Sequence, residues 1–504
     1  MPLTNLFGRI APLTLLCTAA LPALATNGMN MEGYGPVSTA MGGASQAMDH
    51  GTAAMAQNPA TLGLMNDGSR FDLAVGRLGP KVSSSVPGFG SAESSGTSYY
   101  MPAVGYATRR GNLTFGVGVF AQGGMGTEYG ADTFLAMGSG QPVRSELGVG
   151  RVLFPLAWQV TPELTLGATL DFVWAGLDLR MAASGAQLGG LVTSASGNLA
   201  QALPALAGAP WARVDFSNGN DFTGAASSTG WAAKLGLVYR PAPGLIIGAS
   251  YQSETSLGDM KTGATGASLS GFGGFADSGR MTVVDFQWPA MASVGLSWQA
   301  SPALLLAADV KRIGWASVMK DFRMRFDSAG MGGSVSFALP QNWKDQTVMS
   351  LGAAFAVDAA LVLRAGYNQA SNPIPAAYVN PLFPATVKSH YTMGLGYRFT
   401  PASEFNGSLT LTPSASLTTG QGAEAIDICL GVHQIPELFS TAAGQRVFDR
   451  ERTAQTHDIG CAVTALDALP AGIGRPVFFQ GGDLLFTAEL FSKGLRHENL
   501  QRVS

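Results

Sequence analysis

The chain has 504 residues, of which only 12% are charged, and its formal net charge at pH 7 is −3. Soluble proteins carry about 25% charged residues and proteins that bind nucleic acid are usually basic, so both classes fit poorly. After residue 25 no apolar run reaches the roughly 18 residues of a membrane helix, which argues against a helical membrane protein.

Residues 1–25 have the pattern of a secretory signal peptide. Arg9 is their only charge, an apolar stretch runs from Ile10 to Leu24, and the small residues Ala23 and Ala25 fit a cleavage site. We therefore expect an exported protein. The exported part contains no cysteine before residue 421, so it needs a stabiliser other than disulfides, and a closed hydrogen-bonded barrel is one.

Residues 26–65 consist almost entirely of small and amide residues and include Asn58-Pro59-Ala60. Small residues let backbones approach closely, and Asn, Ser and Thr can satisfy the polar groups of an interior wall. We interpret this segment as a plug, because a wide barrel is either filled or an open pore. The alternative is a disordered leader. Pro59 fixes its own φ and favours an extended Asn58, so we expect it to stop the segment from continuing as a helix or strand.

From residue 69 onward the chain is a series of alternating segments. In one of them Leu166, Leu170 and Trp174 share one face, while Thr165 and Asp171 share the other, which is typical of a half-buried strand. Apolar-out and polar-in alternation predicts an all-β fold, a transmembrane antiparallel β-barrel over residues 66–420. The thirteen expected strands are 69–82, 99–109, 113–123, 145–160, 163–181, 228–240, 244–256, 281–299, 303–318, 345–356, 361–370, 388–400 and 405–416.

The C-terminal end does not complete this pattern. Bacterial single-chain barrels have an even number of strands, so a fourteenth is expected after residue 416, and no convincing one is found. Residues 421–504 are richer in charge than the rest. We interpret this atypical tail as a small periplasmic appendage or as a frameshifted or disordered end that has replaced the last strand. The short turns between strands are placed in the periplasm and the long loops outside.

The third strand ends in a glycine-rich stretch. Gly123, Gly124 and Gly126 follow a regularly alternating run, and glycine within a strand pattern marks a bulge or bend. The alternative is an ordinary strand end that runs into a loop. Phe120 precedes these glycines and faces inward by parity, where it could line an apolar pocket or pack on the plug.

The charged residues of the strands share the face opposite the large apolar residues, so we expect them to point inward. Charges on the lipid face would cost about 2–4 kcal/mol at mid-bilayer. The cations that we propose as ligand-binding are Arg151, Lys234, Lys311 and Arg364. Any of them could pair with a fatty-acid carboxylate. The alternative is a structural ladder of ion pairs with the interior acids Glu32, Asp49, Asp171 and Asp309.

The longest loop, residues 183–227, carries apolar residues at helical spacing. We expect a helix there that ends at Pro204. Its apolar stripe could collect a ligand or pack on neighbouring loops.

Several motifs in order along the chain resemble those of the FadL/TodX-type outer-membrane transporters. They are Met41-Gly42-Gly43-Ala44 and Gln57-Asn58-Pro59-Ala60, then Gly116-Val117-Gly118-Val119-Phe120, Gly248-Ala249-Ser250-Tyr251, Leu339-Pro340-Gln341-Asn342-Trp343 and Leu363-Arg364-Ala365-Gly366-Tyr367. The resemblance covers about residues 30–416. It implies a barrel of 14 strands, with residues 26–65 as an N-terminal hatch that plugs the lumen.

The resemblance further implies passive uptake of long-chain fatty acids or aromatic hydrocarbons across the outer membrane of a Gram-negative bacterium. A lateral opening at the third-strand kink would release the ligand. The implied partners are the hydrophobic ligand, outer-membrane lipid and lipopolysaccharide, and the barrel assembly machinery, with the protein as a monomer and no nucleic acid bound.

Two other functions remain open from the residues. A general diffusion porin would have a wet pore without a plug. An outer-membrane lipase would need a wall serine beside His390, but the sequence shows no nucleophile elbow. We therefore expect no enzyme, no catalytic residues, no cofactor and no metal site.

Overall fold

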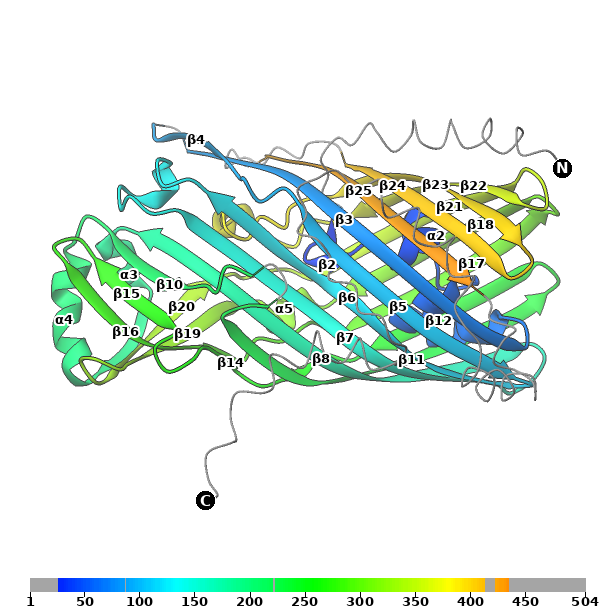
Figure 1. Ribbon diagram of the computed structural model, residues 1–504, viewed down its shortest axis with the longest axis horizontal. Helices are drawn as coiled ribbons and strands as arrows, with labels where there is room; N and C mark the ends of the chain where they lie inside the picture. Colours follow the sequence, from blue (N-terminus) through cyan, green and yellow to red (C-terminus); the bar gives the residue numbers. More distant parts are fainter. Residues whose placement is uncertain (1–25, 87, 221–222, 413–421, 435–504) are drawn as a thin grey trace, which may run out of the picture. The chain divides into compact units, whose positions relative to one another are not determined.

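The computed structural model describes residues 26–86, 88–220, 223–412 and 422–434. The expected signal peptide, residues 1–25, lies outside the described residues, as do residues 435–504 of the tail. Within the described part, fourteen strands pair antiparallel with their neighbours in a closed ring, because the last strand returns to the first (Figure 1). The predicted antiparallel β-barrel is confirmed.

The wall strands follow one another around the ring in sequence order. They are β3 (Gly68–Val86), β5 (Tyr99–Arg110), β6 (Leu113–Tyr129), β7 (Val143–Gln159), β8 (Leu164–Ala183), β11 (Ala226–Ala242), β12 (Leu245–Gln252), β17 (Met291–Ser301), β18 (Leu304–Ile313), β21 (Gln346–Ala356), β22 (Leu361–Ala370), β23 (Ser389–Thr400), β24 (Ser403–Thr412) and β25 (Gly422–Gln434).

The side chains that alternate along the sequence point alternately to the outer face and to the lumen of the barrel. On β8, Leu166 and Leu170 are exposed on the outer face, whereas Thr165 and Thr169 are buried inside. Apolar side chains on the outer face match the hydrocarbon of a bilayer, and small polar ones can meet the polar backbone of a plug.

The strand β25 corrects the expectation for the C-terminal end. The barrel was expected to end at residue 420, yet β25 pairs with β24 on one side and β3 on the other. Its sequence does alternate, with Ile426, Ile428, Leu430 and Val432 at every second position. The charged residues that follow this short run dominate the composition of residues 421–504 and mask its alternation.

The long connections lie at one end of the ring and contain structure of their own. Their strands are β4 (Gly90–Glu93), β9 (Val192–Ser196), β10 (Ala212–Phe216), β13 (Ser256–Leu257), β14 (Met260–Lys261), β15 (Ala267–Gly271), β16 (Phe275–Val284), β19 (Asp321–Ser328) and β20 (Ser334–Pro340). Their helices are η3 (Phe134–Ala136), α3 (Gly185–Gly190), α4 (Gly197–Ala207), α5 (Trp315–Val318) and η4 (Ala376–Tyr378). No helix in the described ranges is long and apolar enough to cross a membrane.

Two expectations for these connections were wrong in detail. The single helix expected in residues 183–227 is instead two helices, α3 and α4, separated by β9, and Pro204 lies inside α4. The single strand expected at 281–299 is two strands, β16 and β17. The chain turns between them at Asp285, whose φ is +58°, and Pro289 follows without an amide hydrogen for a ladder.

Residues 26–65 lie inside the ring at the end with the short turns (Figure 1). This hatch contains β1 (Thr26–Asn27), β2 (Asn30–Met31), α2 (Gly35–Ala40), η1 (Gly51–Ala56) and η2 (Pro59–Leu64). Nearly all of its residues are buried, which small side chains permit because backbone can approach backbone.

The wall meets the hatch through a set of inward glycines that we call the glycine belt. It consists of four directly opposed pairs: Gly105 with Gly118, Gly167 with Gly236, Gly248 with Gly295, and Gly352 with Gly366. A Cβ atom at any of these positions would lie less than 3.0 Å from a hatch atom. The glycines therefore let the hatch sit directly on the wall backbone, and at Gly167, Gly248, Gly352 and Gly366 the contact is with hatch backbone.

Candidate functional site

The motif Asn58-Pro59-Ala60 ties the hatch to β11. The Asn58 side-chain amide donates to the carbonyl oxygens of Gln46 at 2.7 Å and Leu237 at 3.1 Å, and its Oδ1 accepts from the Ala60 amide at 3.1 Å. Asn58 is thus the N-cap of η2. Pro59 follows at the first helical position, where its missing amide hydrogen is no loss, so it begins a helical turn instead of preventing one.

Two of the proposed ligand-binding cations, Lys234 and Arg151, bind other groups of the protein. Lys234 donates to the carbonyl oxygens of Met55, at 3.1 Å, and Ala56, which lie at the C-terminal end of η1 where carbonyls lack helical partners. Arg151 is 1% exposed and pairs with Asp171 at 2.9 Å. Removing either member of such a buried pair is strongly destabilising.

A third cation, Arg364, also has partners. Its Nη1 donates to Asn406 Oδ1 at 2.8 Å, and its Nη2 lies 4.0 Å from a Glu404 carboxylate oxygen. Of the ion pairs expected with Glu32, Asp49, Asp171 and Asp309, the described residues show Arg151 with Asp171. Lys234 and Arg364 have other partners inside the protein.

Lys311 differs from the other three. It is 7% exposed on the inner face of β18, and within the described residues it makes no hydrogen bond or ion pair. Asp309, on the same face, is bound to the hatch, because it accepts the backbone amides of Ser45 at 2.7 Å and Gln46 at 3.0 Å. Lys311 is thus a buried lysine without a hydrogen bond or ion pair among the described residues, and the acidic groups that act on it are Asp309 and Glu32.

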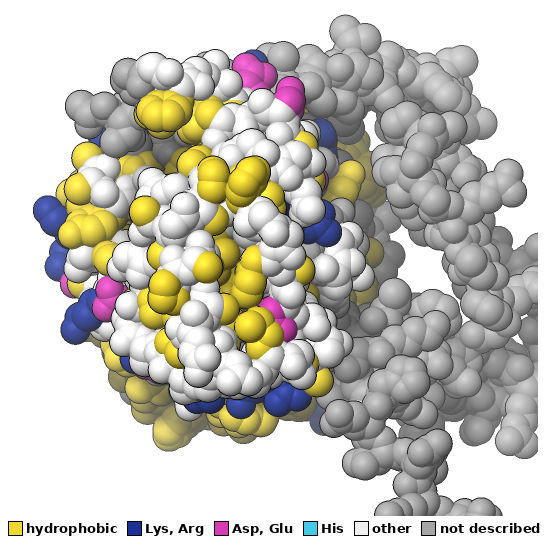
Figure 2. Space-filling view, turned by 90° about the vertical axis from the view of Figure 1, so that its left-hand side faces the viewer, with side chains coloured by type: hydrophobic (Ala, Val, Ile, Leu, Met, Phe, Trp, Pro, Cys, Tyr) yellow, Lys and Arg dark blue, Asp and Glu magenta, His cyan; other side chains and the backbone are white. Residues whose placement is uncertain are grey.

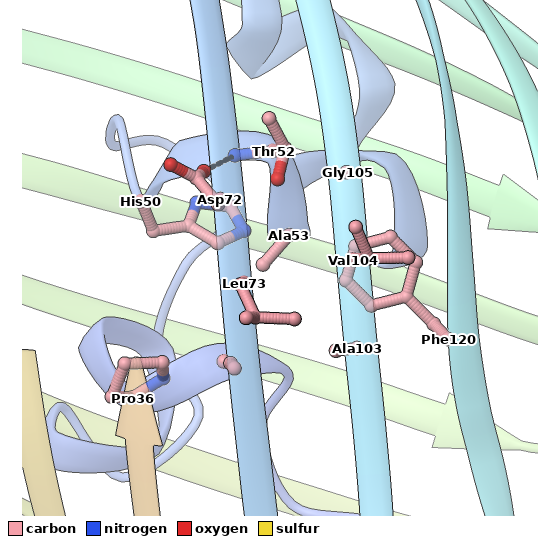
Figure 3. A pocket seen from close by; sticks show the side chains of 12 residues that line it. Pro36, His50, Thr52, Ala53, Asp72, Leu73, Ala103, Val104, Gly105 and Phe120 are labelled. Carbon is pink, nitrogen blue, oxygen red and sulfur yellow. Dashed lines mark hydrogen bonds between the residues drawn. The ribbon is translucent and has the colours of Figure 1, made fainter. Parts of the chain in front are cut away.

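Phe120 lies between the hatch and the wall. It is buried in a cluster with hatch residues that include Met31, Tyr34 and Met55. It also lines a small cavity bounded by the hatch and by β3, β5 and β6, with Asp72 and Thr52 on its other side (Figure 3). Both possibilities considered for this side chain, packing on the plug and lining a pocket, describe its position.

The glycines of the third strand surround a β-bulge. Pairing between β6 and β7 runs regularly to Ala121 opposite Gly150 and resumes with Gly123 opposite Val149, so Gln122 is an extra residue. Gly123 has a φ of +150°, which a residue with a side chain rarely adopts. The bulge predicted from these glycines is present.

The wall is interrupted next to this bulge. The ladder between β5 and β6 ends with Ala103 opposite Phe120, although β6 continues to Tyr129. Farther along, the Ser95 amide donates to the Glu128 carbonyl at 2.8 Å. Between these two points the β6 edge does not pair with β5, and we call this unpaired stretch the wall window.

The hatch fills the wall window with a small hairpin formed by β1 and β2. Asn30 lies opposite Gly123, and the Gly124 amide donates to the Met29 carbonyl at 3.0 Å. Gln122 Nε2 donates to Asn30 Oδ1 at 2.7 Å, and the Tyr34 hydroxyl donates to the Gln122 carbonyl at 2.8 Å. Burial raises the pKa of the Tyr34 phenol above its ordinary value, so it stays a neutral donor.

The same hairpin reaches a tryptophan cluster in the lumen. Trp288, Trp315 and Trp343 are stacked edge to face, with ring centroids 5.5 and 5.3 Å apart, and all three are buried. A Cβ at Gly28 would lie 3.0 Å from Trp315 Nε1, so the turn of the hairpin touches the cluster. Strand parity could not find these residues because they lie in the connections between strands.

The long-loop end of the barrel carries apolar side chains across much of its surface, with basic side chains toward its edge (Figure 2). Several large apolar residues of the long connections are exposed, among them Phe89, Met137, Phe272 and Tyr378. An apolar surface of this kind can adsorb a hydrophobic molecule from its surroundings.

Comparison with known proteins identifies relatives of this chain. The family model described as outer membrane protein transport protein (OMPP1/FadL/TodX) matches residues 15–418. An uncharacterized protein of Chlorobium limicola, from the phosphoenolpyruvate carboxykinase gene 5′ region, is 50% identical over 70 residues. That match covers 14% of this chain and 34% of the relative, so about a third of the relative's length is spanned.

Solved structures extend the likeness over the whole barrel. The toluene transporter TodX of P. putida is 33% identical, with 80% of this chain and 99% of that chain covered and a TM-score of 0.71. The toluene transporter TbuX of Ralstonia pickettii is 32% identical, with 80% and 98% covered and a TM-score of 0.69. A Pseudomonas aeruginosa FadL homologue, 14% identical with 81% and 99% covered and a TM-score of 0.61, shares the fold.

The matched family and the closed ring of strands place the protein in the outer membrane of a Gram-negative bacterium, as predicted. The resemblance noted in the sequence is confirmed: this chain belongs to the OMPP1/FadL/TodX family of outer-membrane transport proteins.

Proposed function

We propose that this protein takes up hydrophobic small molecules passively, either long-chain fatty acids or aromatic hydrocarbons, and releases them sideways into the membrane. The loop end collects the ligand, the tryptophan cluster and its surroundings hold it, and movement of the β1–β2 hairpin opens the wall window. The observation that carries the proposal is the end of the β5–β6 ladder at Ala103 and Phe120, with β2 of the hairpin paired to β6 at Gly123 beyond it.

The contacts of the hatch support a lateral route over a downward one. The glycine belt brings hatch atoms against the wall backbone on eight different strands. A ligand moving straight down would have to break these contacts together. An apolar molecule also gains nothing by entering the aqueous periplasm, whereas the bilayer outside the window is an apolar solvent.

The hairpin provides the coupling between ligand and window. Its turn lies against Trp315 at Gly28, and the next residue, Met29, accepts the Gly124 amide at the window. A ligand that occupies the cluster displaces this turn, and the displacement pulls Met29 and Asn30 away from β6. Binding and opening thereby become one movement.

Lys311 is the cation that we assign to the head group of an anionic ligand. Of the four proposed cations it is the one without a hydrogen bond or ion pair among the described residues. A carboxylate would form a charge-assisted hydrogen bond with its ammonium group. An aromatic hydrocarbon would leave Lys311 unused, so this residue separates the two ligand classes.

The two alternatives have less support. A general porin would have an open lumen, but here the hatch fills it. The lipase would need His390 to activate a serine, yet the His390 ring is hydrogen-bonded to Asn368 at 3.0 Å, and it is Asn368 that bonds Ser350. Contacts with lipopolysaccharide and with the barrel assembly machinery, and the monomeric state, stay predictions.

Deletion of Gln122 tests the lateral route. Without the extra residue the β5–β6 ladder can continue past Phe120 and close the window, so uptake of toluene and of oleate should fall to that of cells lacking the protein. A matched control deletes Gly138, a loop glycine where an added Cβ would meet nothing within 4 Å, and should keep uptake. Full uptake by the Gln122 deletion, in protein that still folds, would refute lateral release.

A further inference from the structure

The wall has one seam, where its first strand β3 pairs with its last strand β25 (Figure 1). Phe71–Ser83 pair there with Gly422–Gln434, from opposite ends of the barrel sequence. The entropic cost of closing a loop rises with its length, and contacts between distant segments form slowly. The seam is therefore the most difficult junction of the ring to form and the easiest to leave open.

The hatch is bonded to β3 on one side of the seam. Arg70 Nη1 donates to both carboxylate oxygens of Asp49, at 2.9 and 3.0 Å. The Thr52 amide donates to the Asp72 carboxylate at 2.5 Å (Figure 3). Two charged side chains of the first strand are thus occupied with the hatch segment around η1.

The hatch is bonded equally to the strands on the other side of the seam. Thr392 on β23 donates to the Ala40 carbonyl at 3.0 Å, and Thr410 on β24 donates to Glu32 Oε1 at 3.1 Å. Helix α2 itself contacts β22, β23, β24, β25 and β3. This helix therefore lies across the inner side of the seam and touches strands from both ends of the sequence.

The short covalent link between the hatch and β3 couples the contacts on the two sides of the seam. Only residues 65–67 separate η2 of the hatch from β3, so the hatch and the first strand move as one unit. Each bond from the hatch to β23 or β24 then also holds β3 beside the last strands. β3 is thereby held close to the strands that precede β25, which raises the effective concentration at which β3 and β25 meet.

We infer that the hatch has a second function, independent of transport: it is an internal template that brings β3 and the last strands together and keeps the seam closed. The inference rests on the bonds to Arg70 and Asp72 on one side and to Thr392 and Thr410 on the other. It predicts that weakening the hatch on this side opens the seam, while weakening it elsewhere does not.

Hydrogen–deuterium exchange on the purified full chain in detergent tests this inference. Thr410→Val removes the hydroxyl bonded to Glu32 while keeping the shape of the side chain, and should raise amide exchange of β3 and β25 about five- to ten-fold. The matched control is Ser297→Ala, which removes an equally buried hydroxyl bonded to the Ala47 carbonyl at 2.6 Å on the far wall. It should leave seam exchange unchanged.

A variant on the β3 side provides an independent check if Thr410→Val does not fold. Arg70→Gln removes the bidentate contact with Asp49 and should raise exchange at the same amides and lower the temperature at which the folded gel band is lost. Equal seam exchange in wild type and in both seam-side variants would overturn the inference. So would a rise in seam exchange in Ser297→Ala as large as in Thr410→Val. Neither readout depends on whether the protein transports anything.

Discussion

The two halves of the lumen are filled in opposite ways. In the half with the short turns, the glycine belt has no side chains and the hatch lies directly on the wall backbone. In the half with the long loops, large side chains meet one another, with Trp288, Trp315 and Trp343 at the centre and Phe322 beside Phe383 at a ring distance of 6.0 Å.

This difference separates a seal from a binding region. Such close packing adjusts poorly, since at Gly167, Gly248, Gly352 and Gly366 an added Cβ would collide with backbone atoms of the hatch. Large side chains at the ends of loops can change rotamer and admit a guest of variable shape. The half with the short turns, the lower half, should therefore tolerate no added side-chain atoms. The half with the long loops, the upper half, should tolerate substitutions, but these should change which ligand is preferred.

The largest effect is expected from removing the seal altogether. Deletion of residues 27–60 takes out the hatch together with its bonds across the seam, so barrels of this variant that still assemble should show, in a reconstituted bilayer, ion conductance that the intact protein lacks. A general porin would already conduct when intact, so equal conductance of the two proteins would contradict the comparison.

A large substitution in the upper half should change ligand binding more than permeability. Trp315→Ala removes a buried ring from the cluster, and such truncations cost about 3–5 kcal/mol of stability. We expect weaker uptake of toluene without ion leakage. Trp298→Ala is the matched control, because Trp298 is 51% exposed on the outer face of β17; if it reduced toluene uptake equally, the cluster would not be the binding region.

A small substitution in the lower half should change permeability more than ligand binding. Gly248→Ala adds one methyl group where the Gln46 carbonyl already lies, so the hatch must shift, at a cost of about 1–3 kcal/mol. Ion leakage should rise while toluene affinity is kept. In the control Gly148→Ala the new methyl meets nothing within 4 Å, and leakage in that variant too would show that the belt is not special.

The smallest effect is expected at Lys311, and it depends on the ligand. Lys311→Gln should weaken binding of oleate about ten-fold through loss of a charge-assisted hydrogen bond, and leave toluene binding unchanged. Ligand-dependent quenching of tryptophan fluorescence in the purified protein measures both. An unchanged oleate affinity would remove Lys311 from the ligand site.

Properties that depend on local patterns could be predicted from the sequence. Alternation along thirteen segments located the wall strands, because each strand carries its own inside and outside. Gly123 and Gly124 indicated the bulge, since glycine permits the backbone angles a bulge needs. The fourteenth strand was missed because a short alternating run was judged together with the charged residues that follow it.

Properties that depend on contacts across the lumen could not be predicted. Parity gave the inward direction of Lys234 and Arg151, but not that one caps η1 and the other pairs with Asp171. Trp288 and Trp343 lie outside the strands, where no periodicity applies. The end of the β5–β6 ladder depends on how two strands pair, and the sequence of β5 alone contains no signal for it.

The extra residue at position 122 has a consequence beyond the window. Before it, the even-numbered residues of β6 face the lumen, and after it the odd-numbered ones do, so Thr127 and Tyr129 point inward instead of into lipid. There the Tyr129 hydroxyl donates to the Pro381 carbonyl at 3.0 Å, and Thr127 donates to the same oxygen at 3.2 Å. The single extra residue thus lies at the interruption of the wall and also turns Thr127 and Tyr129 toward the loop at Pro381, so a change at this one position acts on both features.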